Sequence, residues 1–131
     1  MKKISFDFDS TLDNQHIQEY ASHLMSLGYE IHIVTSRPSR WGQQWKVNGK
    51  AYTIWDNDDL YHIAEILNIN RENIHFMGYD NKYKFFENED FIFHLDDDYT
   101  EVDEINEHTK TKGIVFDDSD WKEKCNELLK S

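Results

Sequence analysis

Two pairs of aspartates stand at the ends of apolar runs in this sequence. Asp7 and Asp9 close the run that begins at Lys2, and Asp96 and Asp97 follow the run 91–95. Carboxylates held side by side repel each other unless a cation or a shared proton compensates their charge. The ligands are all oxygen, without paired cysteines or histidines at metal spacing, which favours Mg²⁺ over zinc or copper. The sequence therefore predicts a magnesium site.

Two further polar residues stand at the ends of predicted elements. Thr35 closes the apolar run 29–35, and Lys82 begins a short helical pattern over 82–87. We expect both side chains to join the aspartates at one edge of a sheet.

The elements that must position these residues follow from hydrophobic periodicity. Short apolar runs predict five strands, over 2–8, 29–35, 74–77, 91–95 and 113–116. Spacings of three and four predict helices over 17–25, 58–67, 82–87, around 102–105 and from about 119, with Asn57 as the N-cap of the second. Asn48-Gly49 stands between two β-prone runs, 44–47 and 50–54, and predicts a type I′ hairpin.

Strands that alternate with helices predict one α/β domain over residues 1–131. We expect a three-layer Rossmann-like fold with a mostly parallel five-stranded sheet, helices on both faces, and a small hairpin insertion over 38–55. In such folds, ligands bind at the carboxyl ends of the strands.

With these residues in order, the sequence resembles the haloacid dehalogenase (HAD) superfamily. Asp7-Phe8-Asp9-Ser10-Thr11-Leu12 looks like its motif I, and Ile31-His32-Ile33-Val34-Thr35 looks like motif II. Lys82 matches motif III, and Asp96-Asp97 matches the Asp-Asp form of motif IV. Ser10 departs from the pattern, because many relatives carry glycine there.

The resemblance implies a capless HAD-like phosphatase that works through an aspartyl phosphate. Asp7 would be the nucleophile and Asp9 the general acid and base, with Thr35 and Lys82 holding the phosphoryl oxygens. Mg²⁺ would be held by Asp7, Asp9 through its backbone carbonyl, Asp96 and Asp97. The substrate-binding candidates are Thr11, Ser36, Arg37 and Trp41.

Several assignments stay open at this point. Lys84 competes with Lys82 as the motif III lysine, and Asp98 competes with Asp97 as the second motif IV acid, with Glu101 nearby. Arg37 either reaches the substrate phosphate or closes its own loop through an acidic neighbour. His94, just before the motif IV aspartates, is expected to make a buried structural hydrogen bond.

The aromatic residues near the predicted hairpin also allow two interpretations. They form either a local core of the hairpin or a substrate-facing surface that acts as a small lid; they are Trp41, Trp45, Tyr52 and Trp55. In the second case they would stack on a base and so select nucleotides.

Composition restricts the partners and the compartment. With 14 Lys and Arg against 26 Asp and Glu, the net charge of -12 disfavours extended nucleic-acid binding. The single cysteine, Cys125, cannot form an intramolecular disulfide and is predicted to be a buried helix residue. No apolar run is long enough for a signal peptide or a membrane span, so we expect a cytoplasmic protein.

The function predicted from the sequence is phosphomonoester hydrolysis, on a nucleotide or a nucleic-acid 3′-phosphate end. A phosphatase of a non-nucleotide metabolite and a catalytically idle binding or scaffold protein are the alternatives. A receiver-type signalling module uses similar residues but places its acidic pair first, whereas here Asp96-Asp97 comes last.

Overall fold

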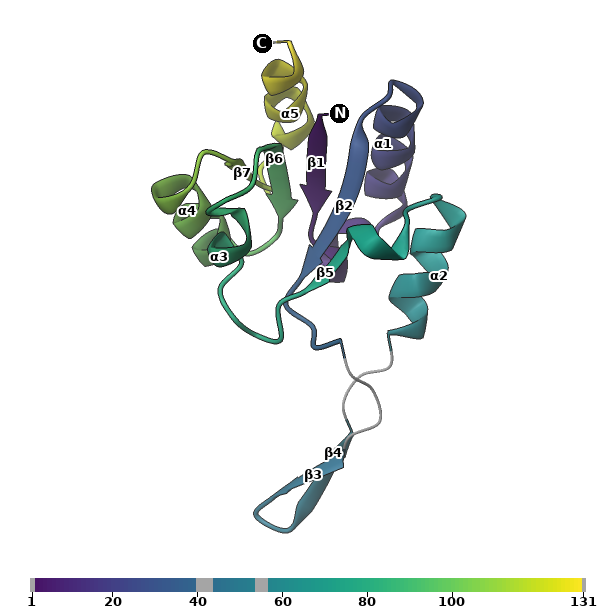
Figure 1. Ribbon diagram of the computed structural model, residues 1–131, viewed down its shortest axis with the longest axis vertical. Coiled ribbons are helices and arrows are strands. Elements are labelled where there is room, and N and C mark those ends of the chain that lie inside the picture. The colour runs from purple at the N-terminus through teal and green to yellow at the C-terminus, as the bar shows by residue number, and fades with distance from the viewer. Residues whose placement is uncertain (1, 40–43, 54–56, 131) are drawn as a thin grey trace.

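The computed structural model describes residues 2–39, 44–53 and 57–130, with only the backbone of 44–47 and 51–53. Its centre is a five-stranded sheet with the order β5-β2-β1-β6-β7 (Figure 1). All neighbouring strands of this sheet are parallel. The strands are β1 (Lys3–Phe6), β2 (Glu30–Thr35), β5 (Ile74–Phe76), β6 (Phe91–Asp96) and β7 (Lys112–Val115). The predicted parallel α/β sheet is confirmed.

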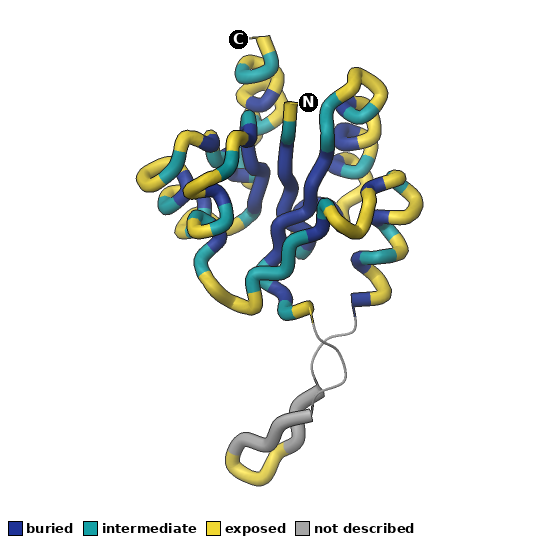
Figure 2. Tube along the Cα trace, in the orientation of Figure 1, coloured by how far each residue is buried: buried dark blue, intermediate teal, exposed yellow. Residues whose placement is uncertain are grey.

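Helices cover both faces of the sheet and make three layers. The larger hydrophobic core receives residues from α1 (Gln15–Ser26), α2 (Asp58–Ile66) and α5 (Trp121–Leu129). A second core receives Phe86 from α3 (Tyr83–Phe86) and Ile105 from α4 (Tyr99–His108). The strands between these cores are mostly buried along their length (Figure 2). The fold is a Rossmann-like three-layer sandwich, as predicted.

Cys125 and Asn57 test two local predictions from the sequence. Cys125 is fully buried in α5, and burial raises the pKa of its thiol to about 12, so it is a structural residue as predicted. Asn57 directly precedes α2, but its side chain makes no capping hydrogen bond. Its Nδ2 instead donates to the carbonyl of Pro38 at 3.0 Å. Asn57 thus occupies the predicted N-cap position, but its side chain bonds to Pro38 at the other end of the insertion and not to the helix.

The predicted hairpin is present as a separate two-stranded antiparallel sheet. It consists of β3 (Gln44–Val47) and β4 (Lys50–Thr53). The connecting Asn48 and Gly49 have φ angles of 52° and 79°, and a type I′ turn requires positive φ at both positions. Trp41 and Trp55 lie outside the described residues, as do the side chains of Trp45 and Tyr52. The predicted lid therefore stays a prediction.

An irregularity in β6 decides which side chains face the site. Lys3 pairs with Phe91, whereas Ser5 pairs with His94, so β6 carries one extra residue opposite β1. A bulge of this kind changes the face to which the following side chains point. It places His94 beside Ser5 and against the ring of Phe86 in α3, with ring centroids 5.2 Å apart.

Three chemically important residues end adjacent strands. Asp7 follows β1, Thr35 closes β2 and Asp96 closes β6, and β1 lies between the other two strands. The backbone N–H of Asp7 donates to the carbonyl of Leu95 at 2.9 Å, which extends the pairing of β1 with β6 by one residue.

Among the described helices, none has both the length and the apolar composition to cross a bilayer.

Candidate active site

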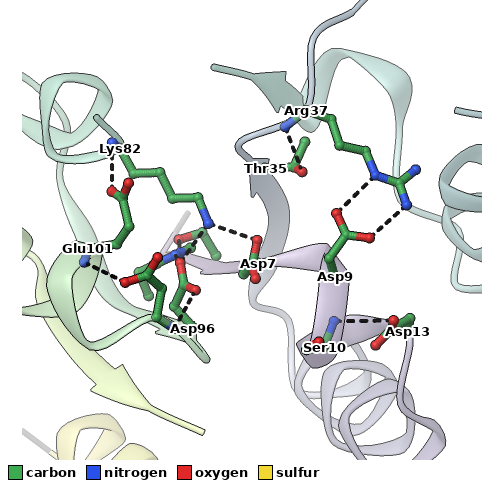
Figure 3. Close-up of polar contacts among 12 residues, drawn as sticks. Asp7, Asp9, Ser10, Asp13, Thr35, Arg37, Lys82, Asp96 and Glu101 are labelled. Atoms are coloured by element: carbon green, nitrogen blue, oxygen red, sulfur yellow. Dashed lines mark hydrogen bonds and ion pairs between the residues drawn. The ribbon is translucent and has the colours of Figure 1, made fainter. Parts of the chain in front are cut away.

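A buried ammonium group joins the two principal aspartates. The Nζ atom of Lys82 donates to Asp7 Oδ1 at 2.7 Å and to Asp96 Oδ2 at 2.6 Å (Figure 3). Lys82 is only 2% exposed and Asp96 is fully buried. Burial alone would lower the pKa of Lys82, but the two carboxylates raise it overall, so the lysine stays charged. Three elements far apart in sequence thus converge on one charged cluster.

The position of Lys82 distinguishes it from the alternative, Lys84. Lys82 directly precedes α3, and its backbone N–H donates to Oε2 of Glu101 in α4 at 2.9 Å. Lys84 is exposed and pairs with Asp80 at 3.0 Å, away from the aspartates. Glu101 therefore contributes by holding the start of α3, and it is Lys82 that the fold brings to the site.

His94 fixes the orientation of Asp96. Its Nε2 lies 2.8 Å from Asp96 Oδ2, and its Nδ1 lies 2.8 Å from the hydroxyl of Ser5. Burial lowers the pKa of His94 although Asp96 opposes this, and a neutral ring that donates from Nε2 and accepts from Ser5 satisfies both contacts. Burial also disfavours the charge of Asp96, but the bonds from His94 and Lys82 hold its pKa well below the ordinary value. The hydrogen bond predicted for His94 is present.

Asp7 is in the opposite electrostatic situation. Burial first, and then the charge of Asp96, raise the pKa of Asp7 well above its ordinary value, although Lys82 opposes them. Asp97 is less buried, and its pKa is raised mainly by burial. Burial and the neighbouring carboxylate thus disfavour full ionisation of this cluster, and a single ammonium group does not offset them.

The three carboxylates fit a divalent cation. Oxygen atoms from Asp7, Asp96 and Asp97 all lie within 4.8 Å of one another. Three carboxylates against one ammonium leave two negative charges, and all the ligands are hard oxygen donors of the type that Mg²⁺ prefers. Asp98 instead caps α4 by accepting from the backbone N–H groups of Thr100 and Glu101. Of the two alternatives, Asp97 is the one that the fold places in the carboxylate group.

Asp9 points away from this group toward Arg37. It lies in the turn Phe8–Leu12 that follows Asp7, where Ser10 has a left-handed φ of 60°. Its carboxylate is half exposed and pairs with Arg37 at 2.7 Å. Its carboxylate is thus outside the three-carboxylate group. A left-handed φ is one that glycine adopts without strain and that other residues adopt less readily.

Arg37 connects Asp9 to the start of α2. Its guanidinium also pairs with Asp59 at 2.8 Å, and it donates to the side chain of Asn57 at 3.4 Å. Burial alone would lower the pKa of Arg37, but the bonds to Asp59 and Asp9 raise it overall. Of the two roles left open for Arg37, closing the loop through acidic neighbours is the one present in this structure.

Two adjacent cavities open at this edge of the sheet. One, of about 180 Å³, is lined by Asp7, Asp9, Ser10, Ser36, Lys82, Asp96, Asp97 and Asp98. The other, of about 210 Å³, is lined by Asp9, Ser36, Arg37 and Tyr79. Asp9 and Ser36 line both, so the two cavities are neighbours at this edge.

Two predicted site residues lie behind this surface. Thr35 is fully buried, and its hydroxyl accepts from the backbone N–H of Arg37 at 3.2 Å. Thr11 is fully buried, and among the described residues its hydroxyl has no hydrogen-bond partner. Neither threonine is among the described residues that line these two cavities. Trp41, the remaining candidate, lies outside the described residues.

Two residues at this edge were not predicted from the sequence. From the sequence, Asp59 is simply an acidic residue in the first turn of a helix. That position does not predict that Asp59 pairs with Arg37. Tyr79 follows Gly78 just after β5. A glycine directly after a predicted strand was the feature of the sequence that could have indicated a turn at this edge.

No protein-family model matches this chain, and a search of the curated proteins found no similar one.

Proposed function

We propose that this protein is a Mg²⁺-dependent phosphomonoester hydrolase of the HAD type, with Asp7 as its nucleophile. The observation that carries the proposal is the cluster of Asp7, Lys82 and Asp96, in which one ammonium group contacts both carboxylates within 2.7 Å at the ends of adjacent strands. Exposed acidic pairs are common, but a buried set with one shared cation is costly and typical of functional sites.

In the first step, an Asp7 oxygen attacks phosphorus and the bond from phosphorus to the leaving oxygen breaks. The leaving oxygen takes a proton from Asp9, which borders both cavities. Both oxygens of Asp9 accept from Arg37 in this structure, so Asp9 must first take up a proton from solvent and release one of these contacts. In the second step, water attacks the aspartyl phosphate, Asp9 takes a proton from that water, and Asp7 is released with inorganic phosphate.

The residues around Asp7 support this reaction by controlling charge. Lys82 provides a fixed cation for the phosphoryl oxygens, and Glu101 and α3 keep it in place. Mg²⁺, held by Asp7, Asp96, Asp97 and the Asp9 carbonyl, would neutralise phosphoryl charge and keep Asp7 ionised. His94 holds Asp96 in the orientation that faces Lys82.

For the substrate we propose a nucleotide or a nucleic-acid 3′-phosphate end. The net charge of -12 supports contact with a chain end over a long duplex tract. A cytosolic location is also our proposal, supported by Cys125, which is buried within the core and has no other cysteine in the chain to pair with.

The test is a screen of purified protein against a panel of phosphomonoesters with Mg²⁺, alongside Asp7→Asn and Asp9→Asn. We expect Asp7→Asn to abolish turnover with an unchanged circular dichroism spectrum. Asp9→Asn should lose about 10²- to 10⁴-fold with a poor leaving group, the usual contribution of general acid catalysis. Full activity of Asp7→Asn would refute the nucleophile assignment, and a wild-type protein that binds phosphate esters without turnover would indicate an idle binding protein.

A further inference from the structure

Tyr79 has an unfavourable backbone conformation beside the candidate site. Its φ is +67°, and that of the preceding Gly78 is +58°. Glycine adopts such angles freely, but a bulky aromatic residue rarely does, and conformations of this kind persist only where the surrounding structure imposes them.

Backbone hydrogen bonds to the segment after β2 impose it here. The N–H groups of Met77, Gly78 and Tyr79 donate to the carbonyls of Thr35, Arg37 and Ser36, at 2.8, 3.1 and 2.7 Å in that order. The turn after β5 is thereby tied to the loop that lines both cavities. The backbone position of Tyr79 is therefore set by the fold of the site.

Tyr79 also lines the cavity that adjoins the cluster of Asp7 and Lys82. Tyr79 is 68% exposed and lines the 210 Å³ cavity together with Asp9, Ser36 and Arg37. The reacting phosphate belongs in the neighbouring cavity with Asp7 and Lys82. Because Asp9 protonates the leaving oxygen and borders both cavities, the rest of the leaving group extends toward Tyr79.

We propose that Tyr79 determines substrate specificity by stacking its ring on a flat aromatic part of the leaving group, such as a nucleobase. This inference rests on the proposed phosphatase function and assigns Tyr79 as the residue that contacts the leaving group and discriminates between substrates. The other described residues of the cavity are polar or charged, and Tyr79 is the aromatic one among them. Stacking needs a planar partner, so a sugar or an aliphatic chain would gain little from it.

The experiment compares two substrates that differ only in the base. These are thymidine 3′-monophosphate and the abasic 1,2-dideoxyribose 3-phosphate, which share the same leaving oxygen. Tyr79→Gly removes the ring and suits the left-handed backbone, so its Tm should not fall. We expect it to raise KM for the nucleotide about tenfold while the abasic substrate changes less than about twofold. Tyr79→Phe, which keeps the ring, should retain the wild-type preference for the nucleotide.

Tyr99→Ala is the matched control, because Tyr99 is 55% exposed and is not among the described residues that line either cavity. It should leave both KM values unchanged. Equal changes for both substrates in Tyr79→Gly, or no change for either, would overturn the role of Tyr79. Binding of the same two compounds to Asp7→Asn separates this result from the proposed function. A base-dependent affinity that needs Tyr79 supports the inference even if wild-type protein hydrolyses neither compound.

Discussion

The carboxylate of Asp9 lies in the fork of the Arg37 guanidinium. Nε donates to Oδ2 at 2.9 Å and Nη2 donates to Oδ1 at 2.7 Å. The other side of the same guanidinium holds Asp59, so the group proposed as general acid is fixed to the first turn of α2. This bidentate geometry specifies orientation as well as charge.

Arg37→Lys should therefore lower kcat by about tenfold or more, because an ammonium group cannot hold both oxygens of Asp9 in one plane. The loss should be greatest with poor leaving groups, which depend on protonation by Asp9. Measuring kcat and KM over a series of aryl phosphates checks this. A raised KM with unchanged kcat would indicate instead that Arg37 binds the substrate phosphate. Asp59→Asn, on the far side of Arg37, should change kcat less than about threefold.

Lys82→Met and Lys84→Met form a matched pair. Lys82→Met leaves Asp7 and Asp96 without their shared buried cation, and breaking a buried ion pair costs about 3 to 5 kcal/mol. We expect a lower free energy of unfolding, partly restored by Mg²⁺, and a severe loss of turnover. Lys84 lies in an exposed pair with Asp80 that solvent screens, so its loss should leave the free energy of unfolding almost unchanged. Equal effects of the two substitutions in urea unfolding and activity assays would contradict the assignment of Lys82.

Mg²⁺ should stabilise the folded protein. A ligand that binds only the folded state at 100 times its Kd adds about 2.7 kcal/mol, which a thermal unfolding series with Mg²⁺ or EDTA will detect. Asp97→Asn removes one of the three clustered carboxylates and should reduce this shift. Asp98→Asn is the control, because asparagine also caps helices and Asp98 is the N-cap of α4. If the Mg²⁺-dependent increase in stability is lost in Asp98→Asn and kept in Asp97→Asn, Asp98 and not Asp97 is the metal ligand.

Acid should destabilise the protein through His75 on β5. Burial, and then the neighbouring His32, lower the pKa of His75 from 6.5 to about 4, whereas Glu89 opposes and Lys3 reinforces this. Because the unfolded state then binds the proton more readily, the stability from this group is complete above pH 6.5 and is lost as the pH falls toward 4. With allowance for solvent screening, we expect a loss of about 1 to 2 kcal/mol.

Urea unfolding between pH 6.5 and 4 measures this loss. His75→Gln should show a shallower decline than the wild type, because glutamine does not titrate. His62→Gln, an exposed substitution in α2, should decline like the wild type. An identical slope in His75→Gln would assign the acid sensitivity to other groups.

The local sequence was enough to predict the parallel sheet, the hairpin and the place of the main polar residues. Apolar runs that end in Asp7, Thr35 and Asp96 identify strands, and the carboxyl ends of neighbouring parallel strands share one edge. Asn48-Gly49 predicted its turn because few residue pairs tolerate two successive left-handed positions. These features depend on residues that are close together in the chain.

Tertiary structure decided the contacts between residues far apart in the chain. The bulge in β6 arises from its pairing with β1, and it sets the face on which His94 meets Asp96. The choice of Lys82 depends on how α3 packs against α4. The pairing of Arg37 with Asp59 and the position of Tyr79 depend on how α2 and β5 meet the end of β2. Hydrophobic periodicity shows which face of an element is buried, but a side-chain partner is selected only when two elements are packed at a definite register and angle.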